Sequence, residues 1–325
     1  MTTLIFLLFA SLFISQSSQE SPELAEATEL TKSVEKLFKE GKFDEALQPA
    51  KRALEIRERL LPRTDQRVAM SLGYLGDVYM ARHDYDNARR TFERLLQMQE
   101  EQFGATDIKL APTLDRLAVL YYEDGKADKA EEFYQRALNA REKAFGPEDV
   151  EVANSLYALG QLYRVRRQYD RALNSYKRSL LIYGHKGGVT TAEFQRASIG
   201  LSCIGYENGN IAAIHKELEQ IQEQFAPGLP LRPPVNILNG YAVYLVKPEY
   251  PMAARARRLA GIVIVEVEID EKGKVTTAKD ICNGLPYLSE SSVKAALKSR
   301  FAPTTLSGVP VKTKGVVQYR FLAPP

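Results

Sequence analysis

The hydrophobic and polar positions of the chain follow two different periods. Up to about residue 225, apolar residues recur every three or four positions, which is the spacing of one face of an α-helix. From Gly261 to Asp270 apolar and polar positions alternate instead, with Glu266 and Glu268 between valines and isoleucine. Alternation of this kind is typical of a half-buried β-strand. The chain is therefore expected to contain a helical region followed by a smaller region with a sheet.

The helical region repeats itself with a period of 42 residues. The alanine in Gly-Lys-Phe-Asp-Glu-Ala46 recurs at that interval, and a further step falls on Ile214 in a degenerate fifth copy. The residues that keep this register are Ala46, Ala88, Ala130 and Ala172; Leu75, Leu117 and Leu159; Tyr79, Tyr121 and Tyr163; and Asp65, Asp107 and Asp149. Each aspartate precedes a new apolar run, which is the place of a helix N-cap. A fixed period of this length indicates stacked copies of one supersecondary unit.

Small residues in the same register predict close helix crossings. Gly76, Ala118 and Gly160 stand on the first helix of a unit, and the recurring alanines stand on the second. Small side chains on both helices let them pack closely, and the neighbouring Phe92, Tyr134 and Tyr176 fill the space around the crossing. The pattern resembles a tetratricopeptide repeat in the long form found in kinesin light chains. That resemblance implies an all-α solenoid of about five helical hairpins over residues 18–225, with atypical repeats at both ends.

A proline-rich segment and a second set of elements follow the repeats. Residues 226–240 contain Pro227, Pro230, Pro233 and Pro234, which cannot be helical and predict a linker. The region after it reads as helix, strand, strand, helix, strand: Met252–Leu259, Gly261–Asp270, Val275–Ile281, Ser289–Arg300 and Val316–Leu322. A three-stranded antiparallel sheet with two helices on one face satisfies this order.

Short motifs follow one another through this last region: Pro248-x-Tyr250-Pro251-x-x-Ala254, Gly261-x-Val263-x-Val265, Ile269-Asp270-x-x-Gly273-x-Val275, Gly284-x-Pro286-x-Leu288, Arg300-Phe301-x-Pro303 and Gly308-x-Pro310-Val311. In this order and spacing they resemble the C-terminal domain of the TonB energy-transducer family, over residues 241–325. Two features depart from that family. Ser299 stands where the family often has Trp, and repeats replace its long Pro-rich spacer. The fold expected for the whole chain is thus a tetratricopeptide solenoid followed by a small α+β TonB-like domain.

Both resemblances imply sites for protein partners. In the TonB family a partner peptide adds to the exposed edge of the last strand through main-chain groups. Here that edge is Val316, Val317, Gln318, Tyr319, Arg320 and Phe321. In tetratricopeptide folds the first helices line the concave face, which by register carries Asp77, Asp115, Tyr122, Asn154, Tyr157, Gln161 and Arg164. We refer to these seven as the groove residues; polar and aromatic side chains of this kind suit peptide recognition.

Other kinds of function find little support in the sequence. A net charge of +3 without a basic stripe argues against nucleic acid. The three histidines share no metal-ligand spacing, and Lys186–Thr191 joins two helical repeats instead of following a strand as a phosphate-binding loop does. We therefore expect no catalytic, metal or cofactor site. Cys203 and Cys282 are expected to be two small buried hydrophobic residues in different domains.

The N-terminus predicts export. Leu4–Ile14 is an apolar run of 11 residues followed by small polar ones, and a bilayer-spanning helix needs about 20. Residues 1–17 are therefore interpreted as a signal peptide, with a short membrane anchor as the alternative. The expected protein is a non-enzymatic periplasmic scaffold that binds proteins or peptides. Its alternative is an inner-membrane transducer that contacts outer-membrane transporters, and a homodimer through the C-terminal domain stays open.

Overall fold

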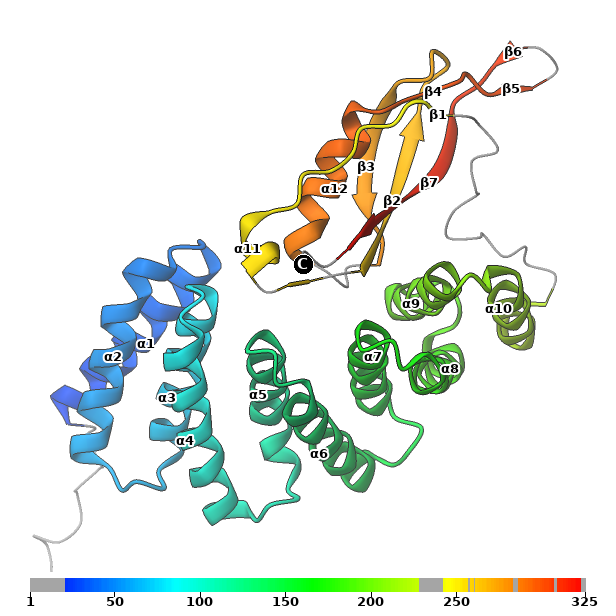
Figure 1. Cartoon of the computed structure of the whole chain (residues 1–325). Coiled ribbons are helices and arrows are strands. Elements are labelled where there is room, and N and C mark those ends of the chain that lie inside the picture. The colour runs from blue at the N-terminus through cyan, green and yellow to red at the C-terminus, as the bar shows by residue number, and fades with distance from the viewer. Residues whose placement is uncertain are drawn as a thin grey trace, which may run out of the picture. The chain divides into compact units, whose positions relative to one another are not determined.

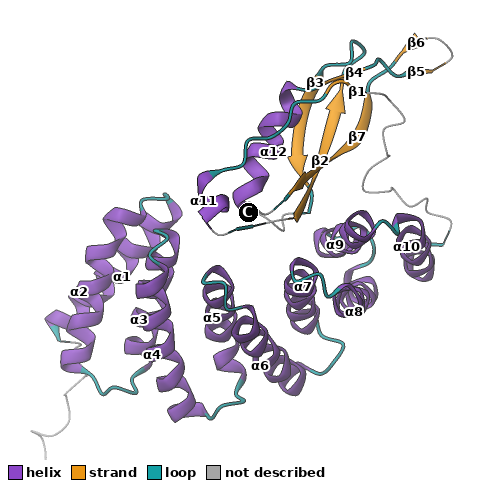
Figure 2. Cartoon of the chain, in the orientation of Figure 1, coloured by secondary structure: helices purple, strands orange, loops and turns teal. Residues whose placement is uncertain are grey.

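The computed structural model describes residues 21–227, 242–256, 258–259, 261–282, 286–306 and 309–322. The predicted signal peptide and nearly all of the predicted linker lie outside these residues. Within the described part, helices α1–α10 come first and a small α+β domain follows them (Figures 1 and 2). The chain divides into two compact units, Met1–Ala140 and Arg141–Pro325, which are described in turn.

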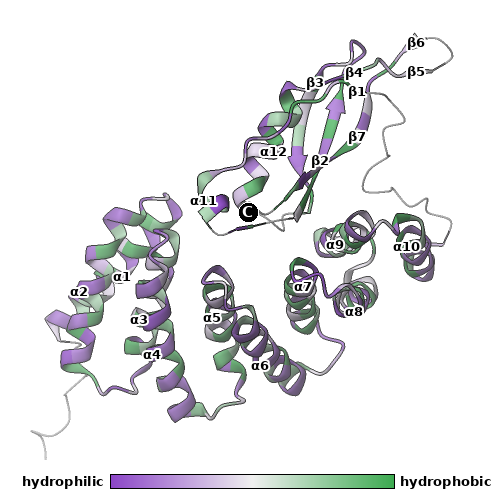
Figure 3. Ribbon diagram, viewed as in Figure 1, coloured by the Kyte–Doolittle hydropathy of each residue, from purple (hydrophilic) through white to green (hydrophobic). Residues whose placement is uncertain are grey.

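The first unit is built from helical hairpins, as the repeat period predicts. Its helices are α1 (Pro22–Lys39), α2 (Phe43–Leu60), α3 (Gln66–Ala81), α4 (Tyr85–Phe103), α5 (Ala111–Glu123) and α6 (Ala127–Phe145), whose last turn enters the second unit. A short 3-10 turn, Ile108–Leu110, leads into α5. Hydrophobic and hydrophilic residues lie on different sides of these helices (Figure 3), because each helix buries one face against its neighbours.

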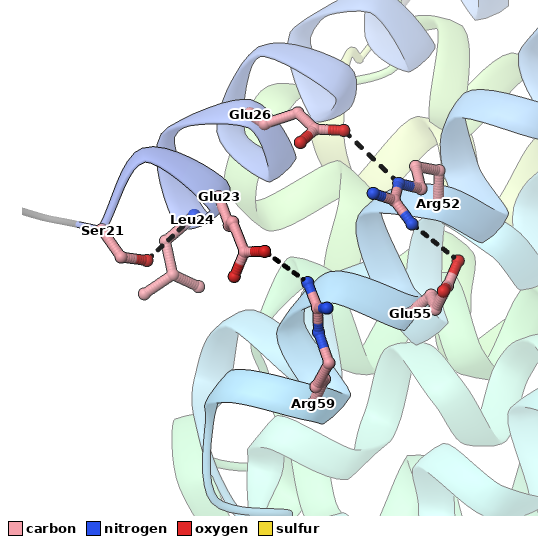
Figure 4. Close-up of polar contacts among 7 residues, drawn as sticks. All are labelled: Ser21, Glu23, Leu24, Glu26, Arg52, Glu55 and Arg59. Atoms are coloured by element: carbon pink, nitrogen blue, oxygen red, sulfur yellow. Dashed lines mark hydrogen bonds and ion pairs between the residues drawn. The ribbon is translucent and has the colours of Figure 1, made fainter.

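The helix starts confirm the predicted caps. The Asp65 carboxylate accepts a hydrogen bond from the Arg67 amide at 2.8 Å, and Asp107 accepts one from Lys109 at the same distance. At the start of α1, the Ser21 hydroxyl accepts from the Leu24 amide at 3.2 Å (Figure 4). The same view shows ion pairs that join α1 to α2, Glu23 with Arg59 at 2.9 Å and Glu26 with Arg52 at 3.4 Å.

The predicted helix crossings are also confirmed. A Cβ atom built on Gly76 would lie 2.5 Å from the Phe92 ring, and one built on Gly160 would lie 2.9 Å from the Tyr176 ring. Both distances are too short for a real side chain, so these two crossings need glycine on the first helix. The recurring Ala46, Ala88, Ala130 and Ala172 are fully buried.

The second unit contains two more hairpins, α7 (Val150–Val165) with α8 (Tyr169–Gly187) and α9 (Ala192–Asn208) with α10 (Ile211–Phe225). The α9–α10 hairpin is the degenerate fifth repeat, and its two departures from the pattern belong together. Gly205 replaces the recurring tyrosine and Ile214 replaces the recurring alanine. A Cβ atom on Gly205 would lie 3.2 Å from Cβ of Ile214 and 2.9 Å from Cα of Ile211. The larger residue on the second helix is therefore accommodated by the smaller one on the first.

The small domain of this unit has the predicted sheet. Strands β2 (Gly261–Ile269), β3 (Val275–Asp280) and β7 (Thr313–Phe321) form an antiparallel sheet in the order β3-β2-β7. Helix α12 (Pro286–Lys298) lies along one face of it (Figure 1), with α11 (Met252–Ala256) beside α12. Two-stranded pairings complete the domain: β1 (Ala242–Tyr244) with β4 (Arg300–Phe301), and β5 (Thr305–Leu306) with β6 (Val309–Pro310).

Three predicted helix boundaries in this domain were wrong. Helix α11 ends at Ala256 rather than Leu259, because Arg258 adopts a left-handed conformation (φ 48°) and the Leu259 amide donates to the Ala254 carbonyl at 3.1 Å, as in a Schellman motif. Helix α12 runs from Pro286 to Lys298 and not from Ser289 to Arg300, since proline suits a first helical turn and Arg300 already belongs to β4. The β2–β3 turn uses Gly273 at φ 77°.

Candidate protein-interaction surfaces

Strand β7 is an edge of the three-stranded sheet, in agreement with the prediction. It pairs along its whole length with β2, from Gly261 opposite Phe321 to Ile269 opposite Thr313, and the described strands include no second partner for it. Its outer row of backbone N–H and C=O groups is thus a template for an added strand. At the end of the strand, Lys314 forms an ion pair with Glu268 of β2 at 2.7 Å.

The six predicted edge residues divide between the two faces of the sheet. Val317, Tyr319 and Phe321 are buried in the domain core, together with Val263, Val265 and Val267 of β2 and with Leu288 and Ala296 of α12. Gln318 and Arg320 are exposed, and Val316 is half-buried on the opposite face. An added strand would therefore meet β7 through its backbone and through Gln318 and Arg320, while the core residues hold β7 in place.

In the first unit the groove residues take part in contacts between first helices. The Asp77 carboxylate of α3 binds the Arg116 guanidinium of α5 through two hydrogen bonds, one of them 3.0 Å long. An equivalent contact joins α3 to α1, where the Tyr74 hydroxyl of α3 binds Glu35. That hydrogen bond together with burial raises the pKa of Tyr74 to about 12. Asp115 and Tyr122 of α5 are half-buried.

In the second unit three groove residues keep part of their surface exposed. Asn154 accepts a hydrogen bond from the Tyr183 hydroxyl at 2.8 Å, and the Tyr157 ring lies 5.7 Å from the Tyr176 ring and 5.9 Å from the Arg196 guanidinium. Gln161 is half-buried one turn further along α7. These three residues share one side of α7, as their spacing predicted.

Arg164 was wrongly assigned to an open groove. Its side chain is 3% exposed, and its guanidinium donates to the Glu207 carboxylate of α9 and to the backbone carbonyl of Cys282. Burial raises the pKa of the Glu207 carboxyl, Arg164 opposes that effect, and nearby Asp280 adds to it. A buried guanidinium needs such partners, because removing one member of a buried ion pair leaves the charge of the other uncompensated.

The expectation for the cysteines was wrong as well. Cys203 of α9 and Cys282, just after β3, form a disulfide across a sequence separation of 79 residues. Each cysteine is buried, as expected of a small hydrophobic residue, but their assignment to different domains did not keep them apart. The sequence offered a signal for this contact in β2. Residues 262–265 read Ile-Val-Ile-Val before the alternation with glutamate begins, which predicts burial on both faces of the strand at that end.

The second face of β2 is covered there by the fifth repeat. Ile264 is fully buried in an apolar cluster with Cys203, Tyr206 and Cys282. Half-buried residues from both parts of the chain surround this cluster: Ile199, Ile211, Ile262, Ile281 and Val316.

A second recurring feature also escaped the sequence reading. Ion pairs join successive second helices at equivalent places, Arg94 with Glu58, Arg136 with Glu100, and Arg178 with Glu142 at 2.7 Å. Both members of the pair recur at the 42-residue period, although they belong to neither the apolar nor the small positions of the repeat. Gly184 and Gln220 occupy these places one repeat later, so the ladder of ion pairs does not continue into the fifth repeat.

Two absences apply to the described residues alone. No helix among them has both the length and the apolar character needed to cross a bilayer. Nor do three or more histidine, cysteine, aspartate or glutamate side chains of that part of the chain gather in a way that could hold a metal ion.

The architecture is that of a helical repeat protein with a small α+β domain at its C-terminal end, and comparison with known proteins identifies both parts. Residues 67–143 and 109–183 match a tetratricopeptide repeat model, residues 37–66 match a second one, and residues 246–322 match the Gram-negative bacterial TonB protein C-terminal domain. The chain thus contains tetratricopeptide repeats followed by a TonB C-terminal domain, and both are interaction folds.

Among curated proteins, the chain is similar to Protein TonB of Vibrio cholerae, 32% identical over 77 residues. The match spans 23% of this chain and about a third (32%) of that protein's length.

Among solved structures, the chain is similar to BtubC (BKLC) from P. vanneervenii, with a TM-score of 0.53, 22% identity, and coverage of 64% of this chain and 84% of that one. A putative kinesin light chain from Podosopora anserina with nearly identical TPR-like repeats gives a TM-score of 0.54 at 17% identity, covering 62% of this chain and 97% of that one. At these identities the likeness concerns the fold.

Proposed function

We propose that the chain is a non-enzymatic scaffold of the bacterial envelope, exported from the cytoplasm, in which the repeats bind one protein and strand β7 binds another. The observation that carries the proposal is the position of β7 at the edge of the sheet in a TonB C-terminal domain. Its neighbour β2 holds it along its full length, so its outer backbone groups are kept extended for a partner strand.

Export is supported by the disulfide. Disulfides persist in oxidising compartments such as the periplasm and are rare in the cytosol. The Cys203–Cys282 bond therefore favours a periplasmic location, in line with the predicted signal peptide at residues 1–17.

The repeats add a second surface of a different character. Asp77, Asp115, Tyr122, Asn154, Tyr157 and Gln161 are polar or aromatic residues of the first helices, and none of them is fully buried. Such residues recognise peptides by hydrogen bonds and ring stacking without a large apolar patch. The partner of this surface is a protein or peptide.

Site-specific photocrosslinking in cells tests the edge strand. A photoreactive amino acid at Gln318 or Arg320, both exposed on β7, should form an adduct with a partner protein, while one at exposed Lys279 of β3 should not. Both Val317→Pro and Gln318→Pro are made, because neighbouring residues of a strand direct their N–H groups to opposite edges and one of the two therefore removes a donor on the outer edge. The variant that removes the outer donor should lose the adduct formed from Arg320 while the domain stays folded. Gln318→Thr should retain the adduct. Equal crosslinking in both folded proline variants would contradict the proposal.

A transducer that couples the inner membrane to outer-membrane transport is the second candidate, and the similarity to Protein TonB favours it. Fractionation separates the two functions. A processed protein recovered with the periplasmic fraction supports the scaffold, and an unprocessed N-terminus in the inner membrane supports the transducer. In the second case the partner of β7 would be an outer-membrane transporter.

A further inference from the structure

The face of α9 that contacts the sheet has the same register as the groove residues. Ile199, Cys203 and Tyr206 lie one period of 42 residues after Tyr157, Gln161 and Arg164 of α7. They are four and three residues apart, so they share one face of the helix. The fifth repeat thus presents an apolar version of the surface that is polar in the preceding repeats.

That apolar face is already occupied. Ile199, Cys203 and Tyr206 pack with Ile264 and Cys282 of the small domain. Beside them, Arg164 of α7 donates both to Glu207 of α9 and to the Cys282 carbonyl, so one buried cation satisfies groups from both parts.

The fully buried apolar part of this contact is small. The cluster contains four buried side chains among the described residues, whereas the core of the small domain contains thirteen. A covalent bond through the centre of the cluster supplies the constraint that so few side chains lack, because it keeps the two surfaces in contact at a very high effective concentration.

We propose that the groove face of the fifth repeat is the docking site of this chain's own TonB-like domain, and that oxidation of Cys203 and Cys282 locks the domain there. The reaction is thiol–disulfide exchange: the two thiols lose two protons and two electrons, and a disulfide donor is reduced to two thiols. The docked arrangement is completed after the chain enters an oxidising compartment. The edge strand β7 is then presented from a fixed base.

The chain contains no tryptophan, which makes the docking directly observable. In full-length Tyr206→Trp, the introduced indole lies in the cluster, and Ile199→Trp places one at the half-buried rim if the first variant does not fold. Reduction should shift the emission to longer wavelength and increase acrylamide quenching several-fold. Adding Cys203→Ser and Cys282→Ser should give the same spectrum without reductant. Tyr121→Trp, in the first unit, is the control whose emission should not respond.

The outcomes are distinct and none requires the binding partner. Unchanged emission with both thiols shown to be reduced would overturn the lock, because the domain would dock without it. An exposed indole in the oxidised protein would overturn the docking itself. Thiol labelling of chains taken from cells completes the test: the disulfide should be present in the full chain and absent when residues 1–17 are deleted. A disulfide that forms equally well in both chains would exclude control by the compartment.

Discussion

The first helices of the early repeats and of the fifth repeat carry different residues on the same face. On α3 and α5 this face has Asp77, Asp115 and Tyr122, and one of its acids is held by an arginine of the next repeat. On α9 it has Ile199, Cys203 and Tyr206, which pack in an apolar cluster with the small domain. The register defines a binding face in both regions, and side-chain chemistry decides its occupant. Charged and aromatic residues suit an exchangeable partner, whereas apolar residues and a disulfide suit a permanent one.

The repeat register underlies this comparison, and Ala130→Glu should break it with the largest effect. Ala130 is fully buried at a helix crossing, so the variant forces a carboxylate into a site without partners. We expect a loss of several kcal/mol and local unfolding that extends to neighbouring repeats, since each repeat buries its face on the next. Circular dichroism melts measure it, with Gln135→Glu on the exposed side of the same helix as control. An unchanged melt would show that the register is misassigned.

The permanent character of the second contact depends on its disulfide. A loop of roughly 80 residues is closed by Cys203 and Cys282, for which the chain-entropy model gives about 4.5 kcal/mol of stabilisation. Cys203→Ser with Cys282→Ser should lower the free energy of unfolding of the second unit by an amount of this order. Urea denaturation of oxidised wild type and of the double variant measures the difference. A double variant as stable as wild type would mean that the bond adds nothing to the folded state.

A buried and a half-exposed ion pair of the second unit should differ in how much stability is lost when each is broken. Arg164→Met leaves Glu207 buried without its cation, which typically costs about 3–5 kcal/mol. Arg178→Met removes a half-exposed member of the ladder, and the expected cost is below about 1 kcal/mol. Chemical denaturation of both variants gives the comparison. Arg164→Met/Glu207→Leu should recover part of the loss, because the double variant no longer buries the Glu207 carboxylate without its cation.

The sequence was sufficient for the fold because its strongest signals are local and repeated. Small residues such as Gly76 and Ala88 at fixed intervals predicted the hairpins, and valine alternation predicted β2. The contact between Cys203 and Cys282 is long-range, and periodicity within one element does not reveal its partner. Arg164 illustrates the same limit: its place on the helix face was correct, but what covers that face depends on a segment more than a hundred residues away. The signal that the sequence did contain was apolar Ile262 and Ile264 on the face of β2 that would otherwise be polar.

The smallest expected effect is a dependence of stability on pH, since Glu207 is the titratable group at the centre of the contact. Burial raises the pKa of its carboxyl above the usual 4.5. Nearby Asp280 raises the pKa further, whereas Arg164 and Arg167 lower it. Tyr169 and Tyr176 of α8 also lie near the carboxyl. A carboxyl whose pKa is higher in the folded than in the unfolded chain binds its proton more readily when folded. Its contribution to stability is therefore complete below pH 4.5 and is lost as the pH rises through the raised value.

Glu207→Gln does not titrate, so the difference in unfolding free energy between wild type and this variant isolates the effect. Urea melts between pH 4.5 and about pH 8 should show this difference moving in favour of the variant as the pH rises. Glu142→Gln, which removes a half-exposed acid of the ladder in the same unit, supplies the baseline for losing a carboxylate. A difference that moves towards wild type would mean that Arg164 outweighs burial, and the contact would then be an ordinary ion pair that strengthens as its acid ionises.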